Sequence, residues 1–189
     1  MSNLVKLVTE ADIDSLDEKV VLDQFNELLN QEPPEVIVKQ HPTAKNVKYI
    51  PIDKVEILLT KFFQDWYVEI LKTSQILNSV ATDVRLHYFH PIKKEWRYQD
   101  GTGAVAVQTA KGAAASDMGS IVSDGVMKAL PASKSYAIKD AAEHLGKIFG
   151  RDLNRKDTIA FSGEYSKDDA EKKKEEMRNK VRTQNNASS

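Results

Sequence analysis

The sequence predicts an α+β domain in which an antiparallel three-stranded β-meander packs against a long amphipathic helix, flanked by helices at both ends of the chain. Three patterns support this prediction. Apolar residues recur every three to four positions in residues 51–65, alternate with polar residues from residue 67 onward, and return to helical spacing in residues 129–155. A helix, a run of consecutive strands and a second helix in this order are typical of an α+β fold.

The first segment, residues 1–46, is expected to form an acidic arm that contains a short amphipathic helix. Apolar side chains recur at near-helical spacing in residues 16–30, and Pro33-Pro34 stops the pattern. The apolar side of this helix packs either on the same core or on a neighbouring subunit. Residues 1–35 hold nine acidic and two basic side chains, a net charge of −7, and the rest of the chain carries +6. Such an asymmetry is common among proteins that bind polyanions, but solubility alone can also produce it.

The second segment, residues 47–160, is expected to hold the core. Pro51 suits an early position in a helix that spans about residues 51–65. Residues 67–77 and 80–90 have the composition and alternation of β-strands. The third strand places Trp96 and Tyr98 on the same face, and we expect it to bend near Gly101 and Gly103.

Two further stretches complete the core. Residues 110–128 are small and contain glycines, which indicates a long functional loop or an irregular ribbon. In residues 129–155, apolar residues form one stripe that we expect to pack on the sheet. The residues expected mostly on the open side are Lys139, Glu143, His144, Lys147 and Arg151. The stripe consists of Ile138, Ala141, Ala142, Leu145, Ile148 and Phe149.

The third segment, residues 161–189, is a highly charged tail. Ser166 and Asp169 have the spacing of a cap for a solvated helix, and the last residues are expected to be disordered.

Composition narrows the class of protein. The chain has 189 residues, of which 41% are hydrophobic, enough for one ordinary domain with polar extensions. It contains no cysteine, which excludes disulfides, thiolate nucleophiles and cysteine zinc sites. Because no long apolar run and no secretory signal pattern occur, we expect a soluble, intracellular protein that does not enter a membrane.

Motifs for catalysis, metals and cofactors are missing from the sequence. His87 and His90 point to opposite faces of a strand and have no carboxylate at a ligating interval, so no metal site is predicted. The glycines at 101 and 103 do not fit a dinucleotide fingerprint, and no phosphate-binding P-loop occurs. The acidic residues form no nuclease pattern, and no nucleophile elbow for a serine hydrolase is present. We therefore expect a protein that is not an enzyme and that uses no cofactor.

Basic residues from separate segments fit a binding function better. If they line one groove, each neutralised phosphate releases counterions, and a polyanion binds without regard to sequence. Tyr98 and Tyr136 are then placed to stack on exposed bases. The basic residues are Lys54, Arg97, Lys111, Lys128, Lys134, Lys139, Lys147, Arg151, Arg155 and Lys156.

Several local runs are similar to the annealing domain of the Rad fifty-two family and its phage single-strand annealing relatives. The runs cover about residues 47–155 in the same order as in that family. They are Tyr49-Ile50 followed by Lys54-Val55, then Tyr98 to Gly103, Lys128-Ala129-Leu130, Ala137 to Ala141, and Lys147 to Gly150.

The resemblance implies a protein that anneals complementary single strands of DNA without ATP, in homologous recombination and repair. It implies assembly into a ring or helical filament in the cytoplasm of a bacterial host cell, with a single-strand-binding protein or a phage nuclease as a partner. It also implies that Lys54 and Lys147 line an inner groove. Where family members often carry a Lys-Arg pair, this chain has Glu143-His144, so the groove is either weaker, shifted toward Lys139 and Arg151, or dependent on the charge of His144.

Two other functions remain open from the residues alone. One is a structural or scaffold protein of a phage or mobile element, which assembles through its acidic arm and has no annealing activity. The other is a small metal-dependent nuclease.

Overall fold

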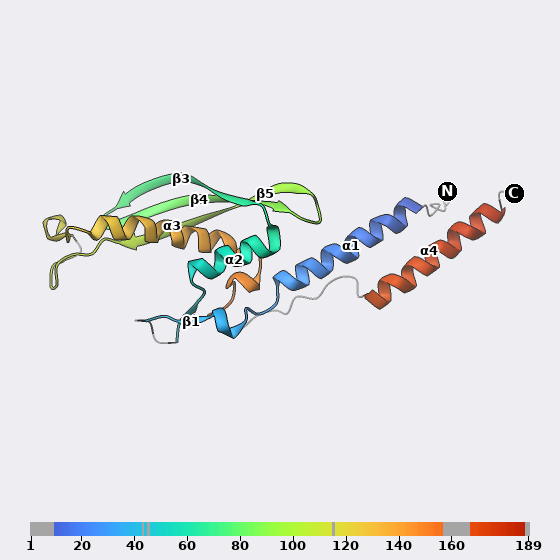
Figure 1. The fold of residues 1–189 in the computed structure, drawn as a ribbon, viewed down its shortest axis with the longest axis horizontal. Coiled ribbons are helices and arrows are strands. Elements are labelled where there is room, and N and C mark those ends of the chain that lie inside the picture. Colours follow the sequence, from blue (N-terminus) through green and yellow to red (C-terminus); the bar gives the residue numbers. More distant parts are fainter. Residues whose placement is uncertain (1–9, 43, 45, 115, 157–166, 188–189) are drawn as a thin grey trace, which may run out of the picture. The chain divides into compact units, whose positions relative to one another are not determined.

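The computed structural model describes residues 10–42, 44, 46–114, 116–156 and 167–187. It shows the predicted α+β fold, with a three-stranded antiparallel sheet, a helix packed against it and helices toward both ends of the chain (Figure 1). The chain divides into two units. Leu29–Thr158 forms one, and Met1–Leu28 together with Ile159–Ser189 forms the other. The larger unit contains the sheet and the candidate site.

The described residues of the smaller unit form two helices, α1 (Glu10–Leu29) and α4 (Lys167–Ala187). The Lys174 ammonium group of α4 forms ion pairs with Asp17 of α1 and, at 3.0 Å, with Glu171. Hydrogen bonds to Asp17 and Glu171 raise the pKa of Lys174. The acidic helix α1 and the highly charged helix α4 are thus joined through Lys174. Ser166, the expected cap, and the last two residues lie outside the described residues.

The sheet of the larger unit has the order β3-β4-β5. Its strands are β3 (Trp66–Ile76), β4 (Ser79–His90) and β5 (Glu95–Ala106), close to the predicted strands. Tyr67 pairs with His87, which pairs in turn with Tyr98. The register between β4 and β5 is regular throughout, whereas that between β3 and β4 shifts between Ile70 and Lys72.

Two helices, α2 (Ile52–Phe63) and α3 (Gly125–Glu143), lie on the same side of this sheet (Figure 1). The alternation along β4 explains the arrangement, because its even-numbered residues from Val80 to His90 are buried and most of the odd-numbered ones are partly exposed. At one end of the core, the ring of Phe63 lies 4.6 Å from that of Tyr88 and 6.4 Å from that of Phe149, measured between ring centroids. None of the described helices is long and apolar enough to cross a membrane.

The contact between α3 and β5 depends on small residues. Ala129, Ser133, Ala137 and Ala141 recur every fourth position on α3 and are buried. A Cβ atom added to Gly103 would lie 2.3 Å from the carbonyl oxygen of Ser133, and one added to Gly101 would lie 2.3 Å from that of Ala137. The pairing of β5 with β4 is regular at both glycines, so no β-bulge occurs there. The glycines let the helix backbone approach the strand.

The long helix ends earlier than the sequence pattern suggests. After Glu143 the chain turns, and Lys147–Phe149 forms a short 3-10 helix, η3. Ile148 and Phe149 are buried as predicted, although they do not belong to α3. The stretch before α3 is largely irregular, with one short 3-10 helix, η2 (Met118–Ser120).

A small hairpin precedes α2. It pairs β1 (Lys39–Gln40) with β2 (Lys48–Tyr49), so that Lys39 lies opposite Tyr49. The 3-10 helix η1 (Glu35–Ile37) leads into it. The sequence pattern does not predict this hairpin.

Candidate nucleic-acid interface

The predicted basic residues of the larger unit come from several elements. Lys54 lies on α2, Arg97 on β5, and Lys128, Lys134 and Lys139 lie on α3. The others lie in the loop after β5 or in the segment that follows α3; these are Lys111, His144, Lys147, Arg151, Arg155 and Lys156.

Five of these cations form ion pairs with nearby carboxylates. The nitrogen–oxygen distances range from 2.5 Å for Arg97 with Glu95 to 3.9 Å for Lys147 with Glu32. Most of these pairs are exposed, so water screens them and a phosphate can compete for the cation. The remaining three pairs are Lys54 with Asp53, Lys128 with Asp124, and Arg155 with Asp152.

Lys147 and Arg151 differ from the prediction that they face an open groove. Lys147 lies in η3 and is only 6% exposed, with its ammonium group near Glu32. Arg151 is partly buried, and its guanidinium group donates a hydrogen bond to the side-chain oxygen of Asn30. Both cations therefore help to fix the segment after α3 against the start of the larger unit, and Lys147 is a poor contact for a bound strand.

Lys139 has surroundings of a different kind. Its ammonium nitrogen lies 5.2 Å from the ring centroid of Tyr49 and 4.8 Å from that of Tyr136. Among the residues that the structure describes, no carboxylate forms an ion pair with it. Partial burial lowers the pKa of Lys139, and the Glu143 carboxylate opposes this shift. The cation is thus held mainly by two aromatic rings, which attract it through their electron-rich faces.

Lys139 and both tyrosines line a cleft of about 410 Å³, which we call the Lys139 cleft. One wall is α3, and another is the hairpin of β1 and β2, which contributes Lys48 and Tyr49. The exposed edge of β5, from Thr102 to Ala104, forms a third side. The cleft therefore joins segments that are far apart in the sequence, as a binding groove requires.

Two carboxylates also line the cleft. Asp140 accepts a hydrogen bond of 3.0 Å from the backbone N–H of Thr102 and so caps the free edge of β5. Desolvation raises the pKa of Glu143, and the neighbouring Asp140 carboxylate adds to the effect. A raised pKa means that these surroundings disfavour the charged form of the Glu143 carboxyl group. The Glu143 side chain is exposed, so solvent screening limits the shift of its pKa.

The other predicted residues do not share this cleft. Lys134 lies on α3, five residues before Lys139, and so projects roughly 140° away around the helix axis. Lys111, His144 and Lys156 are exposed. Of the two tyrosines expected to stack on bases, Tyr136 lines the cleft, whereas Tyr98 lies on the opposite side of the sheet from α3.

Tyr49 was not among the predicted site residues, although it belongs to one of the runs that carry the family resemblance. Its role depends on the hairpin of β1 and β2, whose strands have two residues each. Strands so short have no detectable alternation, so only the folded chain reveals that Tyr49 faces Lys139.

Within the described residues, no three histidine, aspartate or glutamate side chains are gathered in a way that could hold a metal ion. Comparison of the chain with models of known protein families finds no match. Comparison with curated protein sequences finds none either. The fold and the cleft therefore define the class of protein only as an α+β domain with a half-buried, aromatic-flanked lysine.

Proposed function

We propose that the chain binds single-stranded DNA without regard to sequence in the Lys139 cleft and anneals complementary strands without a nucleotide cofactor. The observation that carries this proposal is Lys139 itself, a half-buried cation flanked by Tyr49 and Tyr136 and without a carboxylate partner among the described residues. A phosphate supplies the missing negative charge, and a base or sugar of the same strand packs on a tyrosine ring.

The helix α3 suggests a path for the strand beyond the cleft. Lys128 precedes Lys139 by eleven residues, so the two lie on the same side of the helix, roughly 16 Å apart. The ion pair of Lys128 with Asp124 is exposed and therefore weak enough for a phosphate to replace. An extended strand can thus contact Lys139 in the cleft and Lys128 farther along the helix.

Annealing requires more than one cleft. A single chain offers few phosphate contacts, whereas many copies side by side hold a long strand by many weak contacts and leave its bases free to pair. The resemblance to the Rad fifty-two family supports a ring or helical filament that acts in recombination and repair in the bacterial cytoplasm. A single-strand-binding protein or a phage nuclease is the expected partner in that setting.

A matched pair of lysine substitutions on α3 tests the cleft. We expect Lys139→Gln to weaken binding of an oligothymidylate about tenfold at low salt, because one phosphate contact and its counterion release are lost. The slope of log affinity against log salt should fall by about 0.7. Lys134→Gln is the control, since it makes the same change at an exposed position on another side of the helix. Fluorescence anisotropy of a labelled oligonucleotide measures the affinity of each variant and its dependence on salt.

Equal weakening by Lys139→Gln and Lys134→Gln would show that the cleft is not the site. Annealing is tested separately, by mixing complementary oligonucleotides with and without the protein at low salt. If strands pair no faster with the protein, the annealing proposal is lost. Assemblies whose size and affinity are indifferent to DNA would instead favour the scaffold function, and cleavage of labelled DNA with magnesium or manganese would favour the nuclease.

A further inference from the structure

The face of the sheet opposite α2 and α3 has a composition unlike the rest of the surface. Within Leu29–Thr158, no described helix or strand covers this open face (Figure 1). Three of its large aromatic side chains are about half exposed, namely Tyr67 at 52%, Trp96 at 53% and Tyr98 at 55%. A soluble domain seldom leaves three large rings together in solvent without a ligand or partner for them.

The rings form a continuous aromatic row across the three strands, which consists of Tyr67, His87, Phe89, Trp96 and Tyr98. Tyr67 and His87 are stacked, with centroids 4.5 Å apart and an interplanar angle of 8°. Trp96 lies 5.5 Å from Tyr67 and 5.8 Å from Phe89, and Tyr98 lies 6.1 Å from His87. The contacts position each ring before any ligand arrives.

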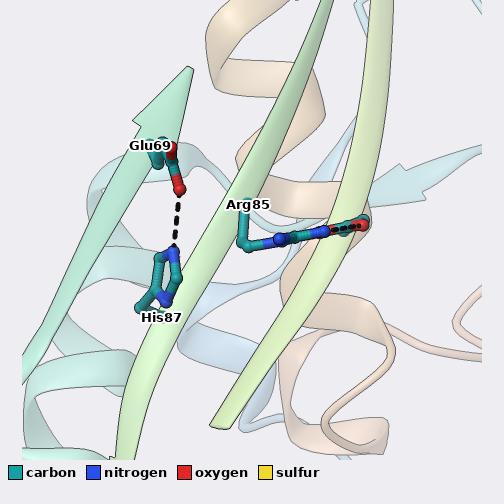
Figure 2. A network of polar contacts seen from close by, with 4 residues as sticks. Glu69, Arg85 and His87 are labelled. Atoms are coloured by element: carbon teal, nitrogen blue, oxygen red, sulfur yellow. Dashed lines mark hydrogen bonds and ion pairs between the residues drawn. The ribbon is translucent and has the colours of Figure 1, made fainter. Parts of the chain in front are cut away.

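A network of polar contacts on the same face includes His87 of the aromatic row (Figure 2). The Glu69 carboxylate of β3 lies 3.1 Å from Nε2 of His87. Arg85 of β4 donates two hydrogen bonds, of 2.7 and 2.9 Å, to the Asp100 carboxylate of β5. The guanidinium carbon of Arg85 also lies 4.1 Å from the ring centroid of Tyr98. Each charged group in this network therefore has a partner on the face itself.

These contacts decide which ligand chemistry the open face suits. Because Arg85 is engaged by Asp100, the network offers no unpaired cation to a phosphate, and the acidic groups repel one. What remains available is the exposed part of rigid, flat rings, which is the surface on which unpaired nucleobases stack. Bases are neutral, so the pairing of the charges does not oppose them.

The open face is also continuous with the Lys139 cleft. Thr102 lines the cleft, while its hydroxyl donates a hydrogen bond of 2.9 Å to Asp83 on the open face. Tyr98 and Trp96 precede Thr102 on the same strand, and their side chains lie on the same face as that of Thr102. The strand β5 is thus the border between the two surfaces.

We propose that the aromatic row is a second contact for single-stranded DNA, which stacks unpaired bases while the Lys139 cleft holds phosphates. This inference rests on the proposed function, and it adds the part of the DNA that each surface recognises. It implies that stacking on the aromatic row contributes affinity that depends little on salt, whereas binding in the cleft weakens as salt rises.

The two tryptophans of the chain allow a direct test. The variant Trp66→Phe leaves Trp96 as the only tryptophan, so its fluorescence reports on the open face. We expect an oligothymidylate to quench Trp96 with the same midpoint as binding measured by anisotropy. An oligomer of abasic sites of equal length keeps the phosphates and lacks the bases. It should bind the cleft and leave Trp96 fluorescence unchanged.

A set of variants at Tyr98 separates stacking from folding. Tyr98→Ala should weaken binding of the oligothymidylate about tenfold, without changing the salt slope or the affinity for the abasic oligomer. Tyr98→Phe keeps the ring and should restore binding. Ser74→Ala is the control, since Ser74 lies on the same face, opposite Ala81 and away from the aromatic row. Thermal unfolding of each variant shows whether the fold is retained.

The possible outcomes distinguish the two proposals. If the oligothymidylate binds and Lys139→Gln weakens it, but Trp96 responds equally to thymidylate and abasic oligomers, the base-stacking proposal is wrong and the proposed function stands. If no oligonucleotide binds at low salt, both are wrong. A blue shift of Trp96 emission that grows with protein concentration in the absence of DNA would show that a second copy covers the open face, which also overturns the stacking proposal.

Discussion

The two faces of the sheet are made by the same three strands, but different contacts hold them. On the covered face, the backbone of α3 lies against Gly101 and Gly103, and a buried hydrogen bond of 2.7 Å joins Thr82 to Ser133. On the open face, side chains of neighbouring strands hold one another through ring contacts and exposed ion pairs. Changes on the covered face should therefore alter stability, and changes on the open face should mainly alter binding.

The same contrast separates two cations. Arg85 on the open face is satisfied by Asp100, whose carboxylate raises the pKa of Arg85 well above its ordinary value. Lys139 in the cleft has two aromatic rings around it and no ion-pair partner among the described residues. The arginine thus orders its own surface, whereas the lysine is available to an anionic ligand.

The largest effect is expected from Gly103→Val. The added side chain would overlap the backbone of α3 at Ser133 and Ala137, which a packed core cannot relieve without moving the helix. We expect a loss of at least about 3 kcal/mol in the free energy of unfolding, measured by urea denaturation. Ala106→Val, at an exposed position on the open face of the same strand, should change the free energy of unfolding by no more than about 0.5 kcal/mol. Similar effects of the two substitutions would remove the distinction between the faces.

A smaller effect is expected from Ser133→Ala. The substitution leaves the buried hydroxyl of Thr82 without its partner, which should lower the free energy of unfolding by about 1–3 kcal/mol. Replacing both groups, in Thr82→Val with Ser133→Ala, should recover most of the loss, because no polar group is then left unpaired. If the double variant is less stable than Ser133→Ala alone, burial of an unpaired hydroxyl is not the cause.

An exposed hydrogen bond on the other face of the sheet provides the control for Ser133→Ala. Thr102 donates a hydrogen bond to Asp83 on the open face, where water can replace either partner. Thr102→Val should therefore change stability by no more than about 0.5 kcal/mol.

The smallest effect is expected from Asp100→Asn and should depend on pH. Hydrogen bonds from Arg85 lower the pKa of Asp100 in the folded state below the ordinary value of 3.8. A depressed pKa contributes stability that is present above pH 3.8 and is lost as the pH falls through the lower, folded-state value. The wild type should thus be slightly more stable than Asp100→Asn at pH 6. Urea midpoints from pH 6 down to pH 2 should show the difference disappear, and a constant difference would mean that the charge is not its source.

Much of the fold followed from periodicity. Apolar alternation located β3, β4 and β5 to within a few residues. The signal is clearest in β4, because one face of this central strand is buried and the other is largely not. Helical spacing located α2 for the same reason. The end of α3 was not predictable in this way, since Ile148 and Phe149 continue the apolar pattern although the chain has left the helix at Glu143.

The candidate site was less predictable than the fold. The sequence pattern indicated Lys139 and Tyr136, but it also indicated Lys147, because the charge of a residue is visible in a sequence and its burial is not. Only the folded chain brings Tyr49 to Lys139 and closes the cleft with the edge of β5. It likewise gathers Tyr67, Trp96 and Tyr98 from two strands onto one uncovered face.

The sequence by itself determined the class of fold, since the alternation of apolar and polar residues dictates which elements can form and which side of each is buried. The tertiary structure alone decided which cations are paired and which rings are exposed. The physical reason is that pairing and burial depend on residues far apart in the chain. Lys139 and Arg85 are both basic residues in ordinary local patterns, and only their neighbours in space make one available and the other engaged.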